Sequence, residues 1–201
     1  YNKINVNVDL DLNLNINLNI NLNLMESRMI CGKEFRTFVD EAEIASIVER
    51  VAEEVSRDYA GKDLMVCPTL TGAFMFATDL VRRMTIPCKL SFVRYASYTG
   101  MSSSGTVRCL LPFPSEVEGK DVLIVEDVVD SGLTMRHVVD DLLPLRPKSV
   151  AICTLFFKPA AFKGDYEVKY IGKEIGNEFI VGYGLDYNEE GRTMPEVMVA
   201  V

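Results

Sequence analysis

From residue 25 onward, the hydrophobic positions alternate between helical spacing and strand-like runs. Asp40 and Glu43 resemble a helix-capping box, after which apolar residues recur at helical spacing until Gly61. A second helical stripe follows Gly72. A third follows Gly132 and carries Met135, Val138, Val139, Leu142 and Leu143. Apolar runs typical of strands separate these helices, at residues 64–67, 89–94, 107–111, 121–126, 150–157 and 179–183. This alternation predicts an α/β fold with a doubly wound, mostly parallel sheet.

The connections between these elements indicate where function resides. In a doubly wound sheet, ligands bind at the carboxyl ends of the strands, where the strand order reverses. We therefore expect functional side chains directly after the buried strands. Residues 97–105 are rich in serine and glycine, which predicts a mobile loop.

Residues 1–24 differ from the rest of the chain. They alternate Asn or Asp with Val, Leu or Ile almost without exception. Such a repeat without turn residues is low-complexity sequence, and any ordered structure in it would be β structure. We predict that residues 1–24 are an extension without a catalytic role and that residues 25–201 form the domain.

Composition and charge narrow the functional classes. The chain has 201 residues and a net charge of −8. The length suits one domain, and the acidic balance argues against a nucleic-acid partner. A phosphorylated small substrate stays possible, because Mg²⁺ and backbone N–H groups neutralise phosphates locally. No apolar run approaches the roughly 18 residues that a membrane span needs, and no signal peptide is visible.

The cysteines and the single histidine argue against disulfide bonds and against hydrolase mechanisms. The five cysteines are scattered without a CxxC pair, which predicts buried, reduced thiols in a cytoplasmic protein. His137 is the only histidine, and its place on the third helix predicts exposure. Without a partner for a Ser–His or Cys–His pair, hydrolase mechanisms are disfavoured.

The strongest pattern is the run at residues 122–134, VLIVEDVVDSGLT. A buried strand delivers the carboxylates of Glu126 and Asp127, and a turn with Ser131 and Gly132 leads into a helix. The N–H groups and the positive dipole at a helix start favour a phosphate. The two carboxylates suit the hydroxyls of a ribose, because each accepts hydrogen bonds.

This run resembles the binding motif for phosphoribosyl pyrophosphate (PRPP) in type I phosphoribosyltransferases. Further segments resemble those of the hypoxanthine-guanine phosphoribosyltransferases, especially bacterial ones, in the same order along residues 34–201. They are the pyrophosphate loop (LTGAFMF, 70–76), the closing loop (97–105), the base-reading segment (157–159), and the base-stacking and metal-binding region (179–192). The resemblance implies the type I phosphoribosyltransferase fold with a small hood near the C-terminus.

The resemblance also implies a reaction and a site. A 5-phosphoribosyl group would pass from PRPP to N9 of hypoxanthine or guanine, with Asp130 as the general base. PRPP and its phosphates would bind Glu126, Asp127, Val128, Val129, Asp130, Ser131, Gly132, Leu133, Thr134, Thr71, Gly72 and Arg192. The purine would bind Lys158, Phe179, Ile180 and Asp186, and Ser97 and Tyr98 would close over it. Mg²⁺ would bind Glu126, Asp127 and, at a second position, Asp186.

Two family features concern residues in the pyrophosphate and phosphate loops. In the family, the peptide bond before Thr71 is often cis. Thr71 itself departs from the pattern, because many members carry lysine there. The threonine therefore removes a cation beside pyrophosphate. Leu133 also replaces a lysine of some relatives, at a position where backbone N–H groups would do most of the work.

Other functions stay open at this point. One is transfer to another base such as xanthine, and another is a regulator of the same fold that binds RNA. A plain nucleotide-binding module would leave Asp130 unexplained. Family members are usually dimers or tetramers, which predicts a homodimer or homotetramer.

Overall fold

The main sheet has seven strands, and β7 lies in its interior between β3 and β8. The computed structural model of the chain describes residues 27–97 and 107–201. Its strands run in the order β6-β5-β3-β7-β8-β9, and β4 also pairs with β3. All neighbours are parallel except β5 and β6. Their bounds are β3 Leu64–Leu70, β4 Lys89–Leu90, β5 Val93–Ser97, β6 Val107–Leu111, β7 Asp121–Val129, β8 Ser149–Phe157 and β9 Tyr170–Glu174.

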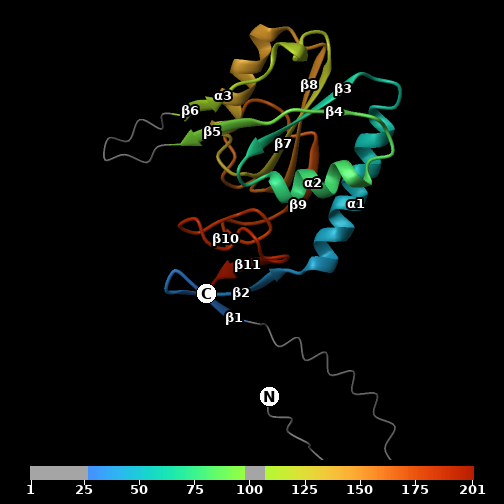
Figure 1. Cartoon of the computed structure of the whole chain (residues 1–201). Coiled ribbons are helices and arrows are strands. Elements are labelled where there is room, and N and C mark those ends of the chain that lie inside the picture. The colour runs from blue at the N-terminus through green and yellow to red at the C-terminus, as the bar shows by residue number, and fades with distance from the viewer. Residues whose placement is uncertain (1–26, 98–106) are drawn as a thin grey trace, which may run out of the picture.

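Helices cover both faces of this sheet, as a doubly wound fold requires (Figure 1). Helices α1 (Glu41–Asp58) and α2 (Phe74–Arg83) share one buried layer with Leu123 and Val125 of β7. Helix α3 (Leu133–Leu142) shares the other layer with Val122 and Ile124 of the same strand. The α/β prediction is confirmed, and β7 is buried from both sides.

The reversal of strand order lies between β3 and β7. After β3 the chain builds β4, β5 and β6 on one side, and then returns to β7 on the other side before continuing to β8 and β9. The loops after β3 and β7 therefore emerge side by side at one edge of the sheet. This edge is where ligands of such sheets bind.

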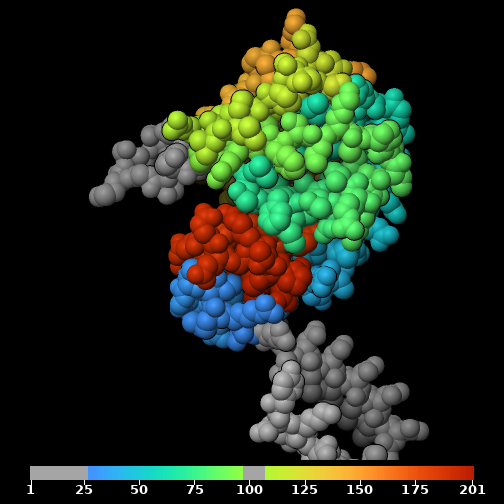
Figure 2. Space-filling model, viewed as in Figure 1, coloured from blue at the N-terminus to red at the C-terminus, as the bar shows by residue number. Residues whose placement is uncertain are grey.

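A second, antiparallel sheet forms a hood from both ends of the described chain. It contains β1 (Ser27–Ile30), β2 (Lys33–Val39), β11 (Val197–Ala200) and β10 (Ile180–Val181), in that order. Its small core holds Ile30, Phe35, Val181 and Met198. In Figure 2 the C-terminal residues (red) lie between the N-terminal hairpin (blue) and the larger lobe. The predicted hood near the C-terminus thus takes half of its strands from residues 27–39.

Several predicted elements differ in their bounds. The run at 89–94 is two strands, β4 and β5, which pair with different parts of β3 and are separated by residues 91–92. Strand β7 extends three residues beyond Glu126, and the predicted strand at 179–183 is only two residues long. The strand pattern of β1, β2, β9 and β11 is too short or too irregular to stand out in the sequence.

Some burial predictions were wrong. Leu143 is 53% exposed, because the tighter 3₁₀ turn at residues 143–145 takes it off the buried face of α3. His137 is half-buried rather than exposed. All five cysteines are free, but only Cys67 and Cys153 are buried, and Cys31 lies exposed in the β1–β2 turn. Among the described residues, no helix is both long and apolar enough to cross a bilayer.

Substitution of Asp40, the N-cap residue of α1, tests how much a single helix cap stabilises the fold. A carboxylate oxygen of Asp40 accepts a hydrogen bond from the Glu43 N–H at 2.8 Å. Asp40→Ala leaves that N–H without its partner, so the free energy of unfolding should fall by about 0.5–2 kcal/mol in urea titrations. Asp40→Ser keeps an acceptor and should lose much less. Equal losses in both variants would contradict the capping role.

Candidate functional site

The site begins at the adjacent carboxyl ends of β3 and β7. Their register pairs Pro68 with Val125, so the turn after β3 faces the last residues of β7. The Leu70–Thr71 peptide bond is cis, as the resemblance implied. A Cβ atom added to Gly72 would stand 1.8 Å from a carboxylate oxygen of Asp127. Only glycine therefore permits this approach of the turn to the carboxylate.

Glu126 and Asp127 form an acidic pair on β7. The Asp127 N–H donates to a Glu126 carboxylate oxygen at 3.1 Å, and the Val128 N–H donates to Asp127 at 2.8 Å. Burial, and then the neighbouring Asp127 carboxylate, raises the pKa of Glu126 well above its usual range. A hydrogen bond from Thr69 on β3 opposes this rise. Two close carboxylates of this kind are stabilised by a cation or by hydroxyl donors.

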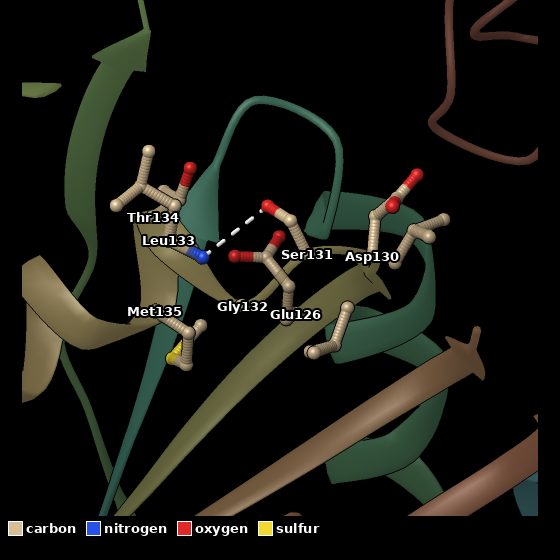
Figure 3. A pocket seen from close by; sticks show the side chains of 9 residues that line it. Glu126, Asp130, Ser131, Gly132, Leu133, Thr134 and Met135 are labelled. Carbon is tan, nitrogen blue, oxygen red and sulfur yellow. Dashed lines mark hydrogen bonds between the residues drawn. The ribbon is translucent and has the colours of Figure 1, made fainter. Parts of the chain in front are cut away.

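The turn at residues 130–132 leads from β7 into α3 and lines a small pocket. Gly132 has the left-handed backbone angles φ 82° and ψ −1°, which glycine adopts without strain. The Leu133 N–H donates to the Ser131 hydroxyl at 3.4 Å, and Figure 3 shows this bond, with the Asp130 carboxylate pointing away from it. The pocket is lined by Glu126 and residues 128–135. The structure thus gathers Glu126 and residues 128–134 of the predicted PRPP-binding set around one turn, whereas Asp127, Thr71, Gly72 and Arg192 do not line this pocket.

Lys158 lies beside Asp130 because of the register between β7 and β8. This register pairs Val129 with Phe157, so the next residue of each strand emerges at the same level. The Lys158 ammonium is 3.1 Å from the Asp130 carboxylate. The lysine side chain is 11% exposed and the aspartate side chain 54%. The lysine is therefore almost enclosed, while the carboxylate it holds stays open to a ligand.

Phe179 presents an aromatic surface at the hood. Its side chain is 46% exposed, although it precedes the buried Ile180. Its ring contacts that of Tyr187 edge to face at 5.4 Å and that of Phe35 at 6.2 Å. The Lys33 ammonium lies 5.4 Å from its centroid. These contacts hold the ring in place and leave part of it open for stacking.

Asp186 and Arg192 are paired with each other rather than gathered at the acidic pair. The Arg192 guanidinium lies 2.7 Å from one Asp186 oxygen and also donates to the Gly184 carbonyl at 2.9 Å. The other Asp186 oxygen accepts from the Glu189 N–H at 2.8 Å. Within residues 27–97 and 107–201, no three acidic, histidine or cysteine side chains form a metal-binding group. The resemblance places Asp186 at a second Mg²⁺, apart from Glu126 and Asp127, and both metal positions stay predictions.

The closing loop lies mostly outside the described residues. Ser97 is the last residue of β5, where it pairs with Val107 of β6. Tyr98 belongs to residues 98–106, which the structure does not describe. The prediction that this loop closes over a ligand stays a prediction.

Two contacts that the sequence did not predict join the hood to the main sheet. The Tyr183 hydroxyl donates to the Asp79 carboxylate of α2 at 2.6 Å. A Cβ atom added to Gly184 would lie 2.1 Å from the Gly72 carbonyl oxygen. Glycine at 184 therefore lets the aromatic segment of the hood touch the turn after β3. Helical spacing gave no indication of the role of Asp79, because it lies off the apolar stripe.

Comparisons with known proteins agree on one family. The model of the phosphoribosyl transferase domain matches residues 37–188. The chain is 41% identical over 159 residues to the hypoxanthine-guanine phosphoribosyltransferase of Mycobacterium bovis, covering 76% of this chain and 79% of the relative. It is 38% identical over 170 residues to the enzyme of that name from Aquifex aeolicus, covering 84% and 96%.

Solved structures give the same result. The crystal structure of a hypoxanthine phosphoribosyltransferase from Staphylococcus aureus has a TM-score of 0.78 and 36% identity. The match covers 83% of this chain and 91% of that one. The α/β fold with its mostly parallel central sheet is therefore that of solved hypoxanthine phosphoribosyltransferase structures.

The raised pKa of Glu126 predicts a pH-dependent stability. In the unfolded chain a glutamate ionises near its ordinary pKa of about 4.3, whereas in the folded chain it resists ionisation. The folded state is therefore penalised increasingly as pH rises above that value. Each unit of pKa displacement corresponds to about 1.4 kcal/mol. Glu126→Gln, which does not titrate, should be more stable than the parent at pH 7.

Urea unfolding between pH 4 and pH 8 checks this. The stability gain of Glu126→Gln should shrink toward zero at the acidic end. Glu53→Gln, which changes an exposed glutamate on α1, provides the matched control. A gain independent of pH, or an equal gain in the control, would show that burial of the Glu126 charge is not the cause.

Proposed function

This chain belongs to the phosphoribosyltransferase family, and we propose that it transfers the 5-phosphoribosyl group of PRPP to N9 of a 6-oxopurine, hypoxanthine or guanine. The products are IMP or GMP and pyrophosphate. The observation that carries this proposal is the 3.1 Å pair of Lys158 and Asp130 at the edge of the phosphate turn. It brings a cation that reads the base next to a carboxylate that accepts its proton.

PRPP binds to the two loops after β3 and β7, where the strand order of the sheet reverses. The 5′-phosphate occupies the turn after β7, where N–H groups at the start of α3 favour an anion. The ribose hydroxyls meet Glu126 and Asp127, and pyrophosphate lies at Thr71 and Gly72. Bound Mg²⁺ would neutralise charge between PRPP and the acidic pair, whose mutual repulsion at Glu126 fits a cation there.

The purine binds between the hood and the end of β8. Phe179 offers a ring face for stacking, and Ile180, which follows it, is buried in the layer of α1 and α2. Asp186 is held by Arg192, so a second Mg²⁺ at Asp186, or an Arg192 contact with pyrophosphate, requires an exchange of this ion pair. Asp130 accepts the purine proton as N9 attacks the anomeric carbon, and Lys158 donates to the oxygen at position six.

The proposal is tested directly by turnover. The purified chain is incubated with PRPP and Mg²⁺ and with hypoxanthine, guanine, xanthine or adenine in separate reactions. Release of pyrophosphate with hypoxanthine or guanine supports the proposal. Turnover with xanthine or adenine alone, or none with any base, would overturn it.

Other parts of the proposal concern the whole protein. We infer that the chain acts in the cytoplasm as a homodimer or homotetramer without a nucleic-acid partner. Residues 1–24 are proposed to have no catalytic role. A chain that starts at Met25 should keep the kcat/KM of the full chain.

Asp130→Asn tests the general base. The amide keeps the size of the side chain but cannot accept the purine proton, so kcat should fall by about 10²–10⁴-fold with little change in the KM for PRPP. Asp63→Asn, which precedes β3 at the opposite end of the sheet, should leave kcat unchanged. A near-normal kcat for Asp130→Asn would remove this carboxylate from the mechanism.

Lys158→Met tests the reading of the base. An ammonium has only donors, so it satisfies the oxygen of hypoxanthine and opposes the amino group of adenine. Leaving a buried polar group unpaired costs roughly 1–3 kcal/mol, which gives the parent tenfold or greater discrimination. The variant should lose most hypoxanthine activity and narrow the kcat/KM gap to adenine. Lys89→Met, away from the site, serves as the control. A variant that still strongly prefers hypoxanthine at the parent's rate would contradict this role.

A further inference from the structure

The segment between β8 and β9 packs against the phosphate turn, although the proposed reaction uses only its first residue, Lys158. Its aromatic side chains form a small cluster. The Phe162 ring contacts that of Phe157 at 5.1 Å and that of Tyr166 at 5.3 Å, both edge to face. The Tyr166 hydroxyl donates to the Gly132 carbonyl at 2.6 Å. A side chain of this segment is thus bonded to the backbone of the turn itself.

Two consecutive carbonyls of the turn are held from this segment. The Lys163 N–H donates to the Ser131 carbonyl at 3.1 Å, and the Tyr166 hydroxyl donates to the next carbonyl, that of Gly132. In a planar trans peptide, the C=O and the following N–H point in opposite directions. Holding the Ser131 and Gly132 carbonyls therefore directs the N–H groups of Gly132 and Leu133 away from the segment. Those N–H groups belong to the residues that line the pocket of the turn.

The Tyr166 bond is additional to the ordinary bond of the helix. The Gly132 carbonyl already accepts from the Arg136 N–H at 3.0 Å, in the first turn of α3. A carbonyl has two lone pairs, and Tyr166 occupies the second. Burial raises the pKa of Tyr166 to about 12, so its hydroxyl keeps its proton at neutral pH. A Cβ atom added to Gly132 would stand 2.6 Å from this hydroxyl, so the contact is close.

We propose that Tyr166 is a positioning residue for the 5′-phosphate of PRPP. Its hydroxyl fixes the plane of the Gly132–Leu133 peptide, and thereby orients the Leu133 N–H, which donates to the Ser131 hydroxyl at 3.4 Å in this structure, toward the side of the turn where the phosphate binds. This proposal rests on the proposed function, which places the 5′-phosphate at this turn. It predicts a selective defect, because the pyrophosphate position at Thr71 and Gly72 lies on another loop.

Tyr166→Phe removes the hydroxyl and keeps the ring against Phe162. Calorimetric titration with ribose 5-phosphate should show affinity weakened by about two- to tenfold, as for the loss of one hydrogen bond. The KM for PRPP should rise by a similar factor. The affinity for pyrophosphate in the presence of Mg²⁺, the KM for hypoxanthine and kcat should each stay within about twofold of the parent's.

Tyr170→Phe is the matched control, because its hydroxyl donates to Asp58 at the far end of α1. It should change none of these binding constants. Unchanged ribose 5-phosphate affinity in Tyr166→Phe, or an equal loss of pyrophosphate affinity, would overturn the positioning role alone. A parent chain that binds pyrophosphate but not ribose 5-phosphate would overturn the proposed function at this turn, and this inference with it.

Discussion

The register of β7 within the parallel sheet is the constraint on which the rest of the structure depends. Residues 122–125 alternate between the layer of α1 and α2 and the layer of α3, and all four are fully buried. A slip of one residue would exchange the two layers, which close packing does not allow. The same register continues to Val129 and Phe157 at the strand ends. The apolar core therefore places Asp130 and Lys158 side by side.

Charge is concentrated at the edge of this core, where it opposes stability. Glu126 resists ionisation because it is buried beside Asp127. Isolated or like charges in such surroundings cost free energy unless a ligand or cation balances them. Strand β7 tolerates this unfavourable free energy, because it is paired with β3 and β8 and its residues 122–125 are buried. A cation or hydroxyl donors at this edge would offset this cost.

The hood packs on the larger lobe through apolar residues, because Val39, Ile180 and Val197 share the buried layer of α1 and α2. Close backbone contacts between the hood and the two turns add to this packing. Gly184 touches the turn at Gly72, and Gly72 in turn touches the carboxylate of Asp127. On the other side, Tyr166 holds the carbonyl of Gly132. Each of these contacts depends on a glycine, because a Cβ atom would collide with its neighbour. Apolar packing and short-range sterics consequently position the turn after β3, the turn after β7 and the hood relative to one another.

Local pattern alone determined the elements whose signals lie within a few residues. The cap at Asp40, the buried strand β7 and the turn at residues 130–132 follow from side-chain spacing and backbone preference, and the roles proposed for Asp130 and Lys158 come from resemblance. Contacts between distant segments were decided only by tertiary structure. They include the hood strands β1 and β2, the pair of Asp186 with Arg192, and the bond from Tyr166 to the phosphate turn. The physical reason is that spacing along the chain reports which face of an element is apolar. It does not report which distant backbone that face will meet.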